Sequence, residues 1–117
     1  ATFFQFNSDA AANYSFRRSD NGGADTTAVS DTAIRVASAG VEPELMVLRI
    51  ANRLASRKRV HIVAGNAPAV ATIPDRQEGV GVWGNTAAQV TTITFTAGTG
   101  GQVFTNGVRL TVYGKKD

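Results

Sequence analysis

Strict alternation of apolar and polar residues in the last quarter of the chain is the feature that most constrains its fold. Every second residue of 92–96 is apolar, and the glycines of 98–101 interrupt the pattern. The alternation resumes in 108–113, after a second turn at Asn106-Gly107. A period of two residues places alternate side chains on opposite faces of a β-strand. The sequence therefore predicts a β-hairpin over 90–114 with one buried face and one wet face.

The rest of the chain divides into short segments of the same kind, separated by Gly, Pro and Asn-Gly turns. Many short strands with turns between them are typical of antiparallel sandwiches and barrels. We expect an all-β fold in a single domain over 1–117, an antiparallel β-sandwich or jelly-roll-like barrel of about seven to eight short strands. The other predicted strands lie at 2–6, 14–17, 32–36, 59–63 and 78–83, and the small, polar stretch 24–31 is predicted to be a loop.

The segment 44–57 fits either a helix or a strand. As a helix, its apolar residues recur at every third position after Pro43, which suits a first helical turn. As a strand, Met46, Leu48 and Ile50 lie on one face. We favour a hairpin with the alternating run 59–63, because the neighbouring segments are β-like and local consistency favours one answer.

Composition removes several classes of protein from consideration. The chain has no cysteine, so it forms neither a disulfide nor a thiolate metal site. Its 43% hydrophobic and 18% charged residues are ordinary for a globular domain. No apolar run approaches the roughly 20 residues that span a bilayer. We therefore expect a soluble protein with no membrane partner.

Basic residues gather in one part of the sequence. The net charge is +3, and no acid lies between Glu44 and Asp75. A basic patch there would suit an acidic surface, a nucleic acid or lipopolysaccharide phosphate, although a solvated turn between two strands would carry the same charges. The candidate partner-binding residues of this patch are Arg49, Arg53, Arg57, Lys58 and Arg59.

Catalytic motifs are not evident. The single histidine, His61, lies on the opposite face of its strand from Val60 and Ile62, the pattern of a surface residue. The chain has neither a G-x-S-x-G elbow nor a Walker loop, and the acids of 20–31 are predicted to form turns rather than a calcium site. Arg76 and Glu78 lie two apart on one strand face and are predicted to form an ion pair. We expect no enzyme activity, no cofactor and no metal.

The aromatic residues offer two binding hypotheses. Phe3, Phe4 and Phe6 are predicted to form a docking arm within 1–8, because exposed rings near a terminus need a partner. Tyr14 and Trp83 are the candidates for stacking on a sugar, with a place in the core as the alternative. Nucleic acid is not an expected partner, since the basic cluster contains no ring.

Two parts of the sequence together resemble a group of small phage virion proteins. In that group an R-x-E-x-x-G-x-W-x-N-T segment precedes an I-T-x-I strand, a turn, a Phe and a closing strand that ends in Leu-Tyr-Gly. The matching pieces here are Arg76, Glu78, Gly81, Trp83, Asn85, Thr86, 90–95, Phe104, Gly107 and 110–114. The match covers about the last 40 residues, and Val112-Tyr113 stands where Leu-Tyr is usual.

The resemblance implies a jelly-roll-like module and a non-enzymatic role in the virion, assembled in the host cytoplasm. It favours a capsid decoration or cement protein that forms a homotrimer and binds the major capsid protein or other virion proteins. The alternative is a receptor- or carbohydrate-binding module of a phage fibre or tail. Modules of this fold serve both roles, so the fold by itself does not choose between them.

Overall fold

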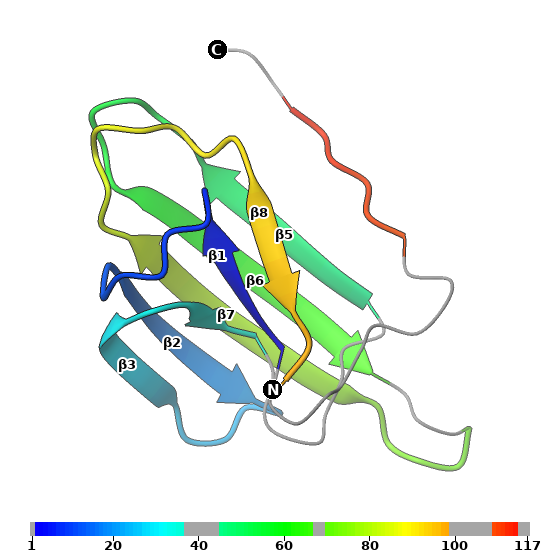
Figure 1. The fold of residues 1–117 in the computed structure, drawn as a ribbon. Coiled ribbons are helices and arrows are strands. Elements are labelled where there is room, and N and C mark those ends of the chain that lie inside the picture. Colours follow the sequence, from blue (N-terminus) through cyan, green and yellow to red (C-terminus); the bar gives the residue numbers. More distant parts are fainter. Residues whose placement is uncertain (1, 37–44, 67–69, 99–108, 115–117) are drawn as a thin grey trace.

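The structure of the chain is a computed structural model that describes residues 2–36, 45–66, 70–98 and 109–114. These residues form eight β-strands and no helix (Figure 1). The strands are β1 (Phe3–Phe6), β2 (Tyr14–Asp20), β3 (Thr26–Asp31), β4 (Ile34–Arg35), β5 (Leu45–Ala51), β6 (Lys58–Asn66), β7 (Asp75–Trp83) and β8 (Ile93–Thr96).

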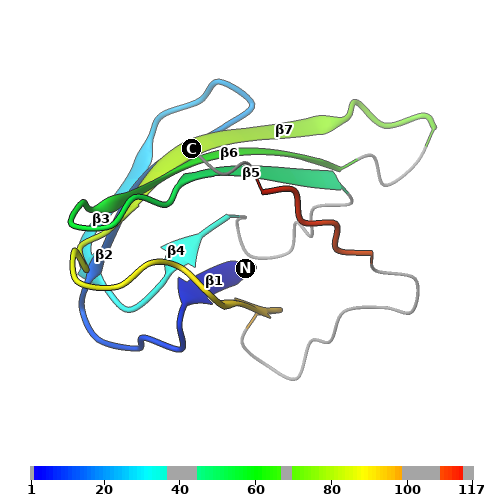
Figure 2. The same cartoon turned by 90° about the horizontal axis from the view of Figure 1, so that it is seen from above.

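Two antiparallel sheets pack face to face as a sandwich (Figure 2). The small sheet has three strands in the order β4-β1-β8, and the large sheet has five in the order β3-β2-β7-β6-β5. The predicted all-β antiparallel sandwich is confirmed. The sheets do not close into a barrel, because in the described part of the chain β5 pairs only with β6 and β8 pairs only with β1.

Aromatic rings from three strands form the centre of the core. Phe4 and Phe6 of β1 are fully buried, and so are Tyr14 of β2 and Trp83 of β7 to within 1% of their surface. The ring centroids of Phe6 and Trp83 are 5.7 Å apart, and those of Tyr14 and Trp83 are 6.5 Å apart. Since each such ring buries about 150–250 Å², the rings of β1, β2 and β7 join the two sheets at the centre of the core.

The ambiguous segment 44–57 contains a strand and a turn, and the predicted hairpin is confirmed. Strand β5 pairs with β6 in a register that runs from Leu45 opposite Gly65 to Ala51 opposite Arg59. The inward side chains of β6 are buried, whereas those of β5 are only half-buried. The difference arises because β5 is the edge of the large sheet.

Two sequence predictions differ from the structure. Residues 26–31 form strand β3 instead of a loop, because pairing with β2 supplies backbone hydrogen bonds to residues that bury little side-chain surface. Residues 109–113 are extended but belong to neither sheet, so this half of the predicted hairpin is wrong for the chain taken alone. Its other half is confirmed as β8, and the connection 99–108 lies outside the described residues.

Gly81 allows the two sheets to approach each other at the centre of β7. A Cβ at this position would lie 2.6 Å from Cδ1 of Ile34, which projects from β4 of the facing sheet. Ile34 is itself fully buried. The glycine in this strand therefore marks close packing between the sheets, as glycines within strands often do.

Candidate functional site

The predicted docking arm is part of the fold. Phe4 and Phe6 have no exposed surface, and β1 lies between β4 and β8 in the small sheet. Only Phe3 is half-buried. The prediction of an exposed phenylalanine arm is therefore wrong for Phe4 and Phe6, because their alternation matches the inward face of a central strand.

The predicted sugar-stacking rings also point into the core. Tyr14 and Trp83 each expose 1% of their surface, which leaves no ring face for a ligand. The Tyr14 hydroxyl accepts a hydrogen bond of 2.9 Å from the Phe6 amide and donates one of 3.0 Å to the Asp9 carbonyl. Stacking on a sugar by this pair is ruled out by their burial, and the core alternative is the correct one.

Asp9 joins the loop after β1 to the core. Its Oδ2 accepts hydrogen bonds from the Asn13 side chain at 2.9 Å and from the Trp83 indole at 2.7 Å. These two bonds, the Asn13 bond foremost, lower the pKa of Asp9 below its usual 3.8. Burial raises the pKa of the Tyr14 hydroxyl above its usual 10.0. The Asp9 shift therefore reflects hydrogen bonding to the carboxylate, and the Tyr14 shift reflects burial of the hydroxyl in the core.

The basic cluster predicted from the sequence divides between two environments. Lys58 is fully buried at the start of β6, where its ammonium donates hydrogen bonds to the carbonyls of Ser56, at 2.5 Å, and Asn85, at 3.3 Å. Its inclusion in a binding patch is wrong, because it belongs to the inward-facing set of β6. The other four cluster residues are exposed: Arg49 on β5, Arg53 and Arg57 in the following turn, and Arg59 on β6.

The strand register brings basic and apolar residues together on the outer face of the large sheet. Arg49 lies directly opposite His61, and Arg59 lies one pair further along, opposite Ala51. Val47 and Val63 form the next outward pair in the other direction. We call this surface the outer patch; it consists of Leu45, Val47, Arg49, Arg59, His61, Val63 and the neighbouring Val80 of β7.

The acid beside the outer patch, Glu78 opposite Val63, pairs with Arg76 rather than with Arg49 or Arg59. Among the described residues, the ion pairs that involve the large sheet are Arg17 with Asp25, Arg18 with Asp20, Asp31 with Arg35 of the small sheet, and Arg76 with Glu78. The last of these confirms the predicted pair. Neither Arg49 nor Arg59 takes part in an ion pair or a side-chain hydrogen bond with another described residue. Neighbouring like charges on a sheet are unfavourable, so the patch is a candidate for binding an acidic surface.

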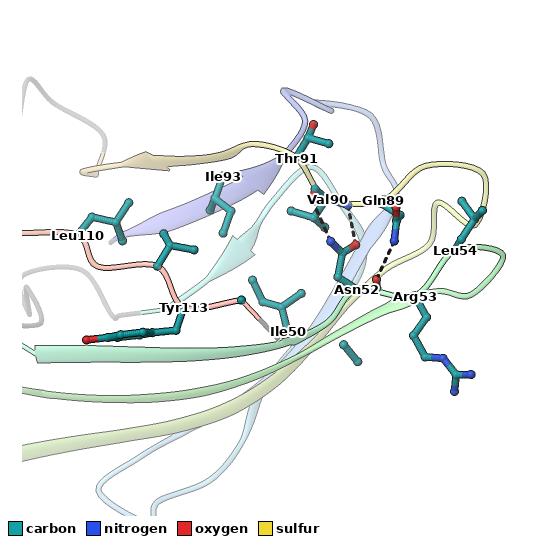
Figure 3. Close-up of a pocket in the computed structure, with 13 residues that line it drawn as sticks. Ile50, Asn52, Arg53, Leu54, Gln89, Val90, Thr91, Ile93, Leu110 and Tyr113 are labelled. Atoms are coloured by element: carbon teal, nitrogen blue, oxygen red, sulfur yellow. Dashed lines mark hydrogen bonds between the residues drawn. The ribbon is translucent and has the colours of Figure 1, made fainter. Parts of the chain in front are cut away.

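A groove of about 980 Å³ opens between the two sheets on the side of β5 and β8 (Figure 3). Its walls come from the end of β5 and the next turn (50–54), from the crossover 89–93, and from the extended segment that contains Leu110 and Val112. Asn52 fixes one end, since its side-chain oxygen accepts from the Val90 amide at 2.7 Å and its side-chain nitrogen donates to the Val90 carbonyl at 2.9 Å.

Among the described residues, no group of three or more His, Asp or Glu side chains is placed to hold a metal ion. The same part of the chain contains no helix that is long and apolar enough to cross a bilayer.

Comparison of the chain with protein-family models, with curated proteins and with solved structures finds no match. The resemblance to phage virion proteins, the capsid partner and the homotrimer therefore stay predictions.

Sequence reasoning missed three of these features. It assigned no role to Asp9, whose partner Trp83 is distant in the sequence, and no signal in the local sequence marks that pair. The valines of the outer patch were also missed, although the alternation in 45–51 and 59–63 could have shown that they share a face with the arginines. The groove depends on which strands are edges, and the sequence does not specify edges.

Proposed function

We propose that this chain is a non-enzymatic structural protein that binds an acidic protein surface through the outer patch, in the manner of a capsid decoration protein. The observation that carries the proposal is the juxtaposition of Arg49 and Arg59 with exposed valines on one flat sheet face. Arginine beside apolar surface is the composition that protein interfaces favour.

A protein partner fits this surface better than a nucleic acid does. Single-stranded nucleic acids are bound by large aromatic rings that stack on bases, and the outward residues of β5, β6 and β7 include no Phe, Tyr or Trp. The apolar residues Val47, Val63 and Val80 would instead be covered by apolar side chains of a partner. Acidic residues at the partner's rim would then pair with the arginines and make attachment sensitive to salt.

The experiment measures rebinding of the purified chain to virion heads from which it has been stripped, at low and at high salt. Its key variant is Arg49→Gln/Arg59→Gln. The control is Arg35→Gln/Arg57→Gln, which removes the same charge from exposed residues outside the outer patch. We expect the first pair to weaken binding about tenfold, or roughly 1.4 kcal/mol, and the control to change it little. Equal losses in both pairs would mean that only net charge matters, and would overturn the proposal.

A second measurement separates an acidic protein from a nucleic acid. Purified chain is titrated with poly-L-glutamate and with single-stranded DNA of matched charge. The proposal expects no preference for DNA and a loss of poly-L-glutamate binding in Arg49→Gln/Arg59→Gln. Strong preference for DNA that disappears in this variant would show a nucleic-acid surface instead.

A further inference from the structure

The sandwich is incomplete on the side where β5 and β8 form the edges of the two sheets. The large sheet has five strands and the small sheet has three, so the large sheet extends past its partner layer. Met46, Leu48 and Ile50 form the inward face of β5 and remain half-buried, whereas Val60 and Ile62 of β6 are buried. A further strand beside β8 would cover this face.

The groove at this place is shaped by contacts from both sheets. Besides the Asn52–Val90 pair, the side-chain oxygen of Asn7 accepts hydrogen bonds from the amides of Thr91, at 2.9 Å, and Thr92, at 3.0 Å. The crossover 89–92 is thus held by asparagines at the ends of β1 and β5. The groove therefore has one fixed end, while β8, within the described ranges, pairs only with β1 and offers its other edge.

The extended segment 109–114 has the pattern of a strand that suits this groove. Leu110 and Val112 contribute to its wall, whereas Arg109 and Thr111 do not, as expected of alternate side chains in an extended chain. At the end of the segment, Tyr113 and Gly114 also line the groove. Figure 1 shows that the segment runs in the direction opposite to β8, as an antiparallel neighbour would. Yet Leu110 and Val112 expose 65% and 74% of their surface, and the segment pairs with no strand.

We propose that the groove between β5 and β8 receives residues 109–113 of a second copy of this chain as an added strand on β8. An unpaired edge is a template for strand addition, and the donor supplies apolar residues to the half-buried inward face of β5. Each copy carries one donor strand and one acceptor edge. Reciprocal or cyclic exchange between identical copies therefore pairs the β8 edge of every copy in a closed assembly.

A second copy is within reach of the donor strand. The connection 97–108 spans up to about 40 Å when extended, which exceeds the two shorter dimensions of the molecule, 30 and 29 Å. Within a single chain the segment lines the groove without filling it, and its apolar side chains stay exposed. Exchange between copies buries these side chains and pairs the free edge of β8 at the same time.

The first test is the oligomeric state of the full chain by sedimentation equilibrium. The key variant is Leu110→Lys/Val112→Lys, and the matched control is Thr111→Lys on the alternate face of the same segment. We expect the full chain and the control to be oligomers and the double variant to be a monomer. Trp83 is the only tryptophan and is buried, so its fluorescence shows whether each variant keeps the folded core.

The absence of cysteine allows a second test that distinguishes exchange from closure within one chain. Chains carrying only Thr94→Cys in β8 are mixed with chains carrying only Thr111→Cys, refolded together and oxidised. Exchange predicts disulfide-linked heterodimers of the two variants in excess over either homodimer. A monomeric full chain, or an oligomer that persists in Leu110→Lys/Val112→Lys, would overturn the proposal. Neither test depends on the outer patch, so the two proposals can fail separately.

Discussion

The Trp83 indole nitrogen donates a hydrogen bond of 2.7 Å to the Asp9 carboxylate, 74 residues earlier in the chain. Asp9 follows β1 of the small sheet, and Trp83 ends β7 of the large sheet. The backbone carbonyl of Asp9 accepts a further hydrogen bond, of 3.0 Å, from the hydroxyl of Tyr14 in β2. One loop residue thus joins the two layers at the aromatic end of the core.

The Asp9 contacts predict a dependence of stability on acid pH. Because the folded state lowers the pKa of Asp9 below 3.8, the unfolded chain binds more protons between the two pKa values. The stability that this carboxylate provides is therefore full above the unfolded value and is lost as the pH falls through the folded value. Asp9→Asn should lower the free energy of unfolding by about 1 kcal/mol at neutral pH. In this variant the free energy of unfolding should also fall less steeply as the pH is lowered.

Urea unfolding measured from neutral pH down to the acid range, by far-UV circular dichroism, tests this dependence. Asp25→Asn is the matched control, because Asp25 lies in an exposed pair with Arg17, and exposed pairs contribute little. The prediction would be contradicted if the free energy of unfolding fell with pH as steeply in Asp9→Asn as in the unmodified chain.

The burial of β1 predicts that its phenylalanines stabilise the fold rather than serve as a binding arm. Phe6→Ala should lower the free energy of unfolding by about 3–5 kcal/mol, since it leaves a cavity beside Trp83. Phe3→Ala should cost less than half as much, because Phe3 is only half-buried. Chemical denaturation of both variants measures the difference, and equal small effects would restore the idea of a detachable arm.

The buried ammonium of Lys58 predicts a structural role for this residue alone in the basic cluster. Lys58→Met keeps the apolar stem but removes the bonds to the Ser56 and Asn85 carbonyls, at a cost of about 1–3 kcal/mol of stability. Arg59 is exposed, so Arg59→Met should change the free energy of unfolding by less than about 0.5 kcal/mol. Thermal and urea unfolding compare the two, and a Lys58→Met chain as stable as the parent would refute this role.

The close approach of Gly81 and Ile34 predicts energetic coupling between the sheets. Gly81→Ala would place a Cβ 2.6 Å from Ile34 Cδ1 and should cost about 1–3 kcal/mol through overpacking. Ile34→Val removes that carbon and alone costs about 0.5–1.5 kcal/mol. A double-mutant cycle should show the pair losing less than the sum by at least about 0.5 kcal/mol. Additive losses in the cycle would show that the sheets move apart instead. Gly114→Ala serves as the neutral control, because a Cβ at Gly114 would have no neighbour within 4 Å.

The sequence determined the class of fold and the faces of its strands. Alternation in 14–17, 59–63 and 78–83 identified strands that the structure contains, because a period of two residues is a local property of the backbone. The pairing of Arg76 with Glu78 followed from the same spacing.

Tertiary structure alone decided which face of each strand is buried and which strands are edges. The phenylalanines of β1 alternate equally well in an arm and in a core, and only pairing with β4 and β8 places them inside. Lys58 and Arg59 are neighbours of like charge, yet the pleat buries one and exposes the other. The alternation in 109–113 likewise predicts a segment able to form a strand. The strand with which it pairs depends on sheet edges, which form only when distant strands pair. Burial and edge position are properties of long-range contacts, and local sequence carries no record of them.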